Sequence, residues 1–196
     1  VLFRSKIFNK SKIFSFEPYL KSYEEMLNFI SDKNFTNVSC YNVGIGDKKE
    51  TKKLYTLKSS IQNSFISPKA DQEFIDTQDS NIIIGDMFCK KNNIKEIDIM
   101  KINCQSMDFE VLKSFEQNIK EGNIKIILIE FDYSDRYIES KSTIGNYENF
   151  LSLYNYKFFD IVLLKRDKNK NKYIKITRGY VMFVNDVLYD NFIKSK

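Results

Sequence analysis

Glu17 is the first residue whose type and position suggest binding chemistry. It lies near the end of the apolar run KIFSFEP (12–18), directly before Pro18, which restricts the backbone there. In open α/β sheets, ligands bind at the carboxyl ends of the strands, and a carboxylate at that edge can accept both hydroxyls of a ribose. Glutamate is also common at surface strand ends that bind nothing. Glu17 is therefore a candidate ribose-binding residue, with a plain surface residue as the alternative.

A second group of polar residues follows the apolar run IDIMKIN (97–103) and consists of Asn103, Gln105 and Ser106. The run predicts a buried strand that carries Asn103 to the same edge of the sheet. A helix predicted to begin near Ser106 has free amide groups in its first turn, which would point toward this edge. These residues could bind a ligand, and they could equally form a polar loop that caps the helix.

Two carboxylates, Glu130 and Asp132, stand at the end of a third apolar run, IKIILIEFD (124–132). Carboxylates there are suited to binding a hydroxyl, an amine or a metal, or they are simply hydrogen-bonded groups at a strand end. The chain contains no histidine, so any proton transfer must fall to Asp, Glu, Lys, Tyr or Cys. Glu130 and Asp132 are the candidate bases.

The elements that position these residues alternate between short apolar runs and amphipathic ones, a pattern typical of an α/β fold with a mostly parallel sheet. We expect strands over 12–18, 38–46, 97–103, 124–132 and 156–164, and helices over 19–32, 107–119 and 147–155. Residues 173–185 should pair with 156–164 as an antiparallel hairpin across a charged turn at 165–172. The other segments are interpreted as a helix tail (1–8), a solvated, partly extended segment (47–57), a loop (58–80) and a short strand entering a short helix (81–92).

Composition narrows the classes of partner and compartment. The net charge is +5, but the 31 basic residues are spread along the chain, so we expect no nucleic-acid partner. Three cysteines without a CxxC spacing argue against a disulfide framework and a zinc site, and we expect no metal. No apolar run approaches the ~18 residues that span a membrane. We expect one cytoplasmic domain over residues 1–196.

The order and spacing of three runs resemble the FkbM family of methyltransferases. These runs are IFSFEPYLKSYEEMLNFI (13–30), NVSCYNVGIGDKKE (37–50) and IDIMKINCQSMDFEVLKSF (97–115). The resemblance implies a Rossmann-like class I methyltransferase fold with S-adenosylmethionine as cofactor. It also implies methyl transfer to a hydroxyl on a sugar, a polysaccharide or a secondary metabolite, so that the partner is a small-molecule or glycan acceptor.

The resemblance also implies roles for individual residues. Glu17 would hold the ribose of the cofactor, and Asn42 with Gly44 would flank its adenine. The loop of Asn103, Gln105 and Ser106 would also bind the cofactor, and Asp108 matches a later acidic position of the family. Glu130 or Asp132 would assist deprotonation of the acceptor, with the loop at 58–80 covering it.

The sequence departs from the family pattern in two ways. Asn103, Gln105 and Ser106 stand where the family usually has aspartate, glutamate and glycine, and an amide cannot act as a base. The family's first strand and its glycine-rich turn are not found in the sequence. That strand belongs between those ending at Glu17 and Asn103, and its loss would leave backbone groups of both unpaired. We therefore interpret the chain as an N-terminally truncated fragment that is itself inactive.

Two other functions remain open beside the methyltransferase. A non-catalytic or degenerate Rossmann-like binding module would explain the asparagine at position 103, because it needs no base. A glycosyltransferase would use the same crevice, but the DxD metal motif that it predicts does not occur in the sequence.

Overall fold

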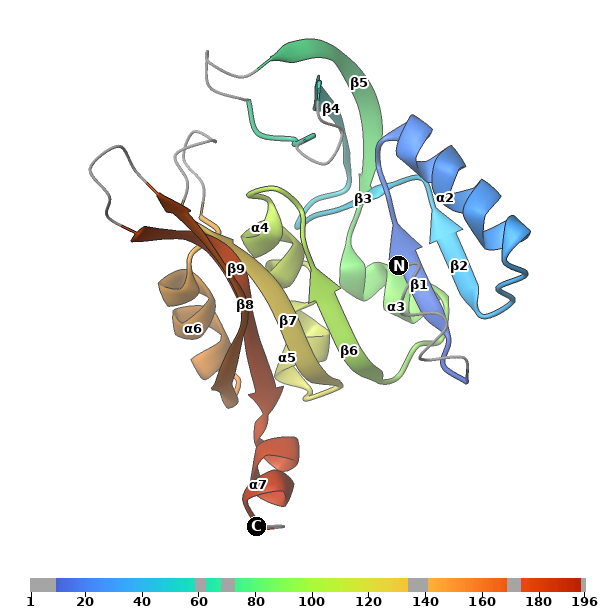
Figure 1. The fold of residues 1–196 in the computed structure, drawn as a ribbon. Helices are drawn as coiled ribbons and strands as arrows, with labels where there is room; N and C mark the ends of the chain where they lie inside the picture. Colours follow the sequence, from blue (N-terminus) through green and yellow to red (C-terminus); the bar gives the residue numbers. More distant parts are fainter. Residues whose placement is uncertain (1–9, 59–62, 68–72, 134–140, 169–173, 195–196) are drawn as a thin grey trace.

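The computed structural model describes residues 10–58, 63–67, 73–133, 141–168 and 174–194 (Figure 1). Its strands form three sheets with both parallel and antiparallel pairs, so the α/β class is confirmed and the expectation of one mostly parallel sheet is not. β1 (Ile13–Phe16) and β2 (Val38–Tyr41) pair in parallel. A second sheet has the order β3 (Gly44–Ile45), β5 (Phe74–Ile83), β4 (Glu50–Leu57). The third has the order β6 (Ile97–Ile102), β7 (Ile124–Asp132), β9 (Ile174–Asn185), β8 (Tyr156–Lys168).

Most of the expected elements are present with small shifts at their ends. The amphipathic run after Pro18 forms α2 (Leu20–Asp32), and the antiparallel hairpin of β8 and β9 is confirmed. The other helices are α3 (Gly85–Lys91), α4 (Asp108–Lys113), α5 (Glu116–Lys120), α6 (Ile144–Ser152) and α7 (Asp186–Lys194). β8 continues to Lys168, into the segment expected to be a charged turn. The helix tail expected at 1–8 lies outside the described residues.

The segment at 47–80 differs most from the expectation. β4 and β5 form a long antiparallel hairpin, so a ladder of backbone hydrogen bonds replaces much of the expected loop. The carboxyl end of β4 is buried rather than solvated, because Leu54 and Leu57 are 2% and 5% exposed. In Figure 1 the hairpin projects above the carboxyl ends of β1 and β6. This polar segment therefore lies next to the expected ligand site.

The helix expected over 107–119 is two helices, with a break between Ser114 and Phe115. Asp86, at the start of α3, accepts hydrogen bonds from the backbone amides of Gln117 (2.8 Å) and Asn118 (3.1 Å). These amides lie in the first turn of α5 and have no partner inside the helix. A carboxylate about 30 residues away in the sequence thus caps α5 and fixes the break.

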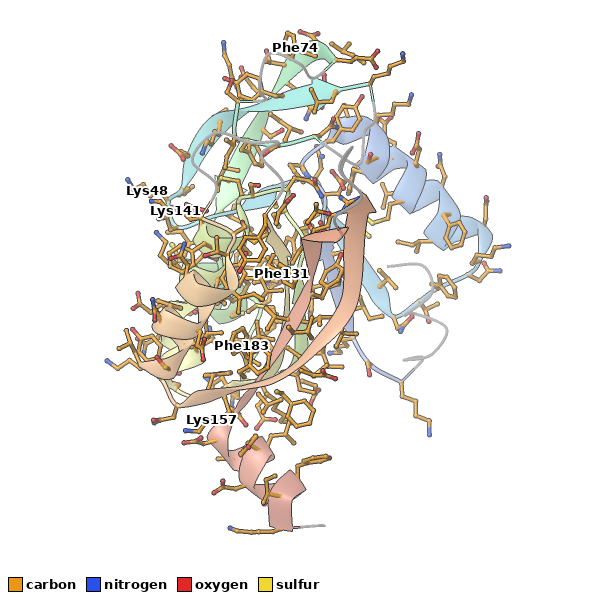
Figure 2. All side chains as sticks on the ribbon, turned by 60° about the vertical axis from the view of Figure 1, so that its left-hand side comes forward. Lys48, Phe74, Phe131, Lys141, Lys157 and Phe183 are labelled. Atoms are coloured by element: carbon orange, nitrogen blue, oxygen red, sulfur yellow. The ribbon has the colours of Figure 1, made fainter. Side chains whose placement is uncertain are left out.

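One face of the third sheet packs against helices and forms the main core. Phe131 and Phe183, on β7 and β9, are 1% exposed and lie inside this layer in Figure 2. Leu112 of α4, Ile119 of α5 and Leu151 of α6 contribute to the same cluster and are fully buried. Alternate residues of β6 and β7 point into this cluster because successive side chains of a strand point to opposite faces. The core therefore fixes the strands that end at Asn103, Glu130 and Asp132.

β1 and β6 are edge strands of separate sheets, and the described residues include no strand that pairs with their other edges. Ile13 and Glu17 donate their amides toward β2, so the backbone groups of Phe16 point away from it. By the same alternation, Ile97 bonds toward β7 and the backbone groups of Ile102 point away. Within the described part of the chain, both edges therefore carry backbone groups that no strand pairs with.

Hydrogen exchange tests this arrangement directly. Ile102 and Ile129 are partners in the ladder, and both side chains are at most 2% exposed. The amide of Ile129 is bonded between strands, whereas that of Ile102 has no partner among the described residues. We expect the Ile102 amide to exchange at least about 100-fold faster than that of Ile129 by NMR. Equal protection would mean that the edge of β6 is paired in solution.

Candidate functional site

Glu17 lies in a braced turn at the carboxyl end of β1. Its Oε1 accepts a hydrogen bond from the backbone amide of Tyr19 at 2.9 Å. Burial raises the pKa of the Glu17 carboxyl above its ordinary value, and the bond from Tyr19 opposes this shift. Oε2 has no partner among the described residues. The carboxylate is therefore fixed in direction by one oxygen and can accept hydroxyls with the other.

Three side chains hold the backbone of this turn. The carbonyl oxygen of Pro18 accepts hydrogen bonds from Asn42 (3.2 Å), Gln78 (2.8 Å) and Ser80 (3.1 Å). Asn42 also donates to the carbonyl of Glu17 at 2.9 Å. Gln78 and Ser80 belong to β5, so the hairpin supports the turn from above. The amide nitrogen of Asn42, which the family resemblance puts beside the adenine, is thus used to hold the main chain.

Gly44 lies in β3 under two apolar side chains. A Cβ at this position would meet the Cδ1 atom of Ile82 at 2.6 Å and the ring of Phe65 at 3.0 Å. The contact leaves no room for any other residue type without movement of these side chains. Packing within the second sheet therefore explains the glycine, and its expected place beside the adenine stays a prediction.

The loop after β6 has an unusual backbone at two successive residues. Gln105 and Ser106 have φ angles of 48° and 77°, in the left-handed region that favours glycine. Ser106 is 2% exposed, and its hydroxyl has no hydrogen-bond partner among the described residues. The family's usual glycine at this position would relieve both costs. The loop thus keeps a glycine-type shape although the glycine is replaced.

Asp108 explains how the loop keeps this shape. Its carboxylate accepts hydrogen bonds from the backbone amides of Cys104 (2.8 Å) and Ser106 (3.1 Å) and from the hydroxyl of Ser142 (3.0 Å). The side chain is 1% exposed. Burial raises the pKa of Asp108 to about 6, outweighing the three donors, which lower it. One buried carboxyl therefore holds together the loop after β6 and the segment before α6.

Asn103 is exposed, and its side chain also contacts the third sheet. Its Nδ2 donates to the hydroxyl of Tyr180 on β9, and its Oδ1 accepts from Gln105 at 3.2 Å. The amine of Lys101 lies 4.7 Å from the ring centroid of Tyr180. Tyr180 was not expected in the site from the sequence, because it is 77 residues from Asn103. Only the strand order β6-β7-β9 brings them together.

Glu130 and Asp132 are both 6% exposed and end β7 beside this loop. Glu130 is the ladder partner of Tyr180, the residue that contacts Asn103. The backbone amide of Asp132 donates to the carbonyl of Ser142 at 2.9 Å. The backbone at the end of β7 is therefore connected to the elements that Asp108 and Asn103 contact.

The thiol of Cys104 shows which of these groups are near one another. Burial raises its pKa, and the negative charges of Asp108, Glu130 and Glu17 raise it further. An electrostatic effect on one thiol requires all three carboxylates to lie near it. The structure thus brings together Glu17 from β1, Glu130 from β7 and the loop that follows β6.

Two of the sequence expectations concern metals and membranes. Among the described residues there is no group of three or more His, Cys, Asp or Glu side chains able to hold a metal ion. Within the same part of the chain, none of the helices has the length and apolar character needed to cross a bilayer.

Replacing Ser106 by glycine should stabilise the protein. The substitution removes a side chain from a left-handed backbone, which costs about 1–2 kcal/mol, and a buried hydroxyl without a partner. The added flexibility of the unfolded chain offsets part of this gain. We expect urea unfolding to give a free energy of unfolding about 1 kcal/mol higher for Ser106→Gly. Ser106→Ala, which keeps the Cβ, should gain less. A less stable glycine variant would contradict this account.

The buried carboxyl of Asp108 predicts a pH dependence of stability. Its folded pKa is raised to about 6 from 3.8, so its contribution to stability is full below pH 3.8 and is lost as the pH rises through about 6. Asp108→Asn does not titrate. We expect the stability of the wild type relative to this variant to fall by roughly 2–3 kcal/mol between pH 4 and 7. A relative stability that increases with pH would show that the three donors outweigh burial.

Comparisons with known proteins assign the family. The methyltransferase FkbM domain matches residues 1–158 of the 196 in the chain. No match was found among curated proteins. A solved structure, methyltransferase FkbM from Methylobacillus flagellatus KT, is similar with a TM-score of 0.49 and 14% identity, over 87% of this chain. The similarity spans 36% of the length of that protein. The domain match covers most of the sequence, and the chain belongs to the FkbM methyltransferase family.

Proposed function

We propose that the protein is an S-adenosylmethionine-dependent methyltransferase that acts on a hydroxyl of a sugar, a polysaccharide or a secondary metabolite. The observation that supports this most is that an anchored carboxylate, Glu17, and a loop held by Asp108 directly follow β1 and β6, two strands that run in the same direction. Family membership supports methyl transfer as the reaction class. The cofactor, the type of acceptor atom and the acceptor itself are parts of the proposal.

The direction of the strands supports a ligand crevice at the carboxyl ends of β1 and β6, which lie in separate sheets. On one side, β2 pairs with β1. On the other side, β7, β9 and β8 follow β6 in that order. Figure 1 shows β1, β2 and β6 running in the same direction. A Rossmann-like sheet has its ligand crevice where the strand order reverses, outside the carboxyl ends of the strands. Glu17 and Asn103 directly follow the two strands that border this point.

The groups that border the crevice fit the adenosyl part of the cofactor. The anchored carboxylate of Glu17 leaves Oε2 to accept ribose hydroxyls. Asn103 and Gln105 carry amide groups that can both donate and accept hydrogen bonds, which suits the amino-acid part. The backbone of the loop is held open by Asp108 rather than by the ligand. Binding would therefore need little rearrangement of these residues.

The chemistry asks for alignment and for one proton acceptor. When bound, S-adenosylmethionine supplies a methyl group on a sulfonium centre. The protein must align a hydroxyl with that methyl group, which is mainly a matter of proximity and orientation. Because the chain has no histidine, we propose Glu130 or Asp132, at the end of β7, as the acceptor of the hydroxyl proton.

A second function, binding without turnover, is favoured by one observation. Asn103 stands where the family usually has aspartate, and its amide is bonded to Tyr180 and Gln105. An amide keeps hydrogen bonds to a ligand but cannot take up a proton. A degenerate binding module would therefore retain the crevice and lose the reaction.

Calorimetric titration with S-adenosylhomocysteine tests the binding half of the proposal. Glu17→Gln keeps an oxygen for the amide of Tyr19 and loses the charge that strengthens bonds to ribose hydroxyls, so we expect binding at least about 10-fold weaker. Glu25→Gln, on the exposed side of α2, has the same change of charge and should bind like the wild type.

Transfer of a labelled methyl group from S-adenosylmethionine to carbohydrate acceptors tests the other half, on the chain itself and on a version that also carries the family's first strand and glycine-rich turn. Equal affinity of Glu17→Gln and the wild type would refute the crevice. Binding without transfer, also after Asn103→Asp restores the carboxylate, would favour the non-catalytic module.

A further inference from the structure

A pocket of about 230 Å³ lies beside the proposed crevice, on the far side of the loop after β6. Its lining comes from the turn before β4, from β4 and β5, from the start of α4 and from Lys141. Met107 lines it directly after Ser106 in the chain. Lys141 precedes Ser142, which bonds to Asp108 and to the backbone of Asp132. The pocket therefore adjoins the end of β7, where the proposed proton acceptors lie.

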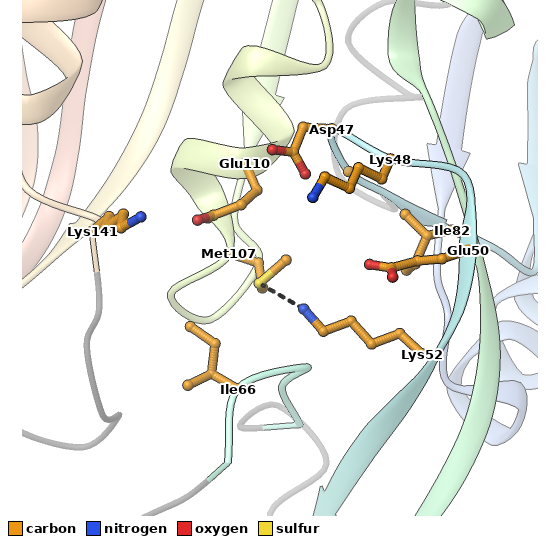
Figure 3. Close-up of a pocket in the computed structure, with 10 residues that line it drawn as sticks. Asp47, Lys48, Glu50, Lys52, Ile66, Ile82, Met107, Glu110 and Lys141 are labelled. Atoms are coloured by element: carbon orange, nitrogen blue, oxygen red, sulfur yellow. Dashed lines mark hydrogen bonds between the residues drawn. The ribbon is translucent and has the colours of Figure 1, made fainter.

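Three lysines reach into this pocket from different elements. Figure 3 shows the amines of Lys48, Lys52 and Lys141 directed toward its centre from three sides. None of the three forms an ion pair with a described residue. The amine of Lys52 has only a weak contact, 3.9 Å, with the sulfur of Met107. Three amines directed into one pocket, none in an ion pair with a described residue, make it favourable for an anion.

The acidic residues of the pocket do not cancel this charge. Asp47 is held in an ion pair with Lys113 of α4 at 2.8 Å, and the Lys113 amine holds the pKa of Asp47 below its ordinary value. The lining then has two other carboxylates, those of Glu50 and Glu110, and three lysine amines. Oε2 of Glu110 is buried and has no hydrogen-bond partner among the described residues. An unsatisfied buried carboxylate oxygen is costly, and a ligand hydroxyl would satisfy it.

Part of the pocket lining is apolar. Ile66, Ile82 and Met107 lie among the lysines and carboxylates that Figure 3 labels. Apolar side chains of this kind pack against the carbon–hydrogen face of a sugar ring and exclude water. The lining thus combines apolar side chains, a hydroxyl acceptor and a cluster of amines.

We propose that this pocket binds an acidic sugar, with its carboxylate or phosphate on Lys48, Lys52 and Lys141 and a ring hydroxyl on Glu110. The identity of this ligand as the methyl acceptor rests on the proposed function. The pocket adds to that function the requirement that the acceptor carry a negative charge.

The methyl group of Met107 is a built-in reporter of the pocket. Protein labelled with 13C at the methionine methyl groups gives one NMR signal for each of five methionines, and only Met107 lines the pocket. The probes are glucuronate, glucose 6-phosphate and the neutral methyl glucoside, with inorganic phosphate alone as a further probe. We expect the two acidic sugars to shift the Met107 signal and the neutral sugar to leave it unchanged. The acidic sugar that binds more tightly shows whether the pocket prefers a carboxylate or a phosphate.

Neighbouring lysines supply the matched control. Lys53 follows Lys52 on β4 and points to the opposite face, and Lys49 follows Lys48 in the turn; neither lines the pocket. The double variant Lys48→Gln/Lys52→Gln should weaken binding of the acidic sugars about 100-fold, because each of the two lost charged contacts contributes about 10-fold. Lys49→Gln/Lys53→Gln, with the same change in net charge, should change it less than about twofold.

Several results would overturn the proposal. These are absence of binding by every probe, equal binding of the neutral sugar, phosphate binding as tightly as glucose 6-phosphate, and equal losses in the two double variants. Acidic sugars that bind as expected without ever being methylated would leave the pocket intact and remove the proposed reaction. Methylation of neutral sugars alone would support the proposed reaction and contradict the proposed role of the pocket.

Discussion

The buried carboxyl of Asp108 is the constraint on which the rest of the site depends. It receives donors from the loop after β6 and from Ser142, which in turn accepts the backbone amide of Asp132 through its carbonyl. The loop after β6 and, through Ser142, the end of β7 are therefore joined at one side chain that is 1% exposed. Burying a carboxyl is costly, and it is tolerated only where hydrogen bonds satisfy the group. The loop geometry follows from that requirement, including the left-handed backbone of Ser106.

A second polar cluster gives the other side of the crevice its shape. The carbonyl of Pro18 collects donors from Asn42, Gln78 and Ser80, and the turn that results fixes Glu17. Gln78 and Ser80 of β5 thus join the hairpin to the turn after β1, which bears the carboxylate of Glu17. The same hairpin contributes Lys52 and Ile82 to the lysine-lined pocket. The hairpin thus shapes the proposed cofactor side and the proposed acceptor side together.

The sequence predicted the elements whose cores are apolar and missed those held by polar contacts. Apolar periodicity located α2, β6 and β7. It thereby placed Glu17 before α2, Asn103 after β6 and Glu130 near the end of β7. Most of β5 lies in the segment predicted to be a loop, because residues such as Asp76 and Gln78 face solvent or a neighbouring turn rather than a core. The break between α4 and α5 depends on Asp86, and no local pattern reveals a cap so distant in the sequence. The contact of Tyr180 with Asn103 depends on strand order in the same way.

The central claim is that Glu17 and the loop at 103–106 border one ligand crevice. The most direct measurement is an NMR titration of the 15N-labelled protein with S-adenosylhomocysteine, following the amides of Tyr19 and Cys104. Both are donors to the carboxylates that shape the crevice. The account predicts that both signals shift with the same dissociation constant while that of Lys91, at the far end of α3, does not move. Shifts at only one of the two amides, or with different dissociation constants, would contradict it.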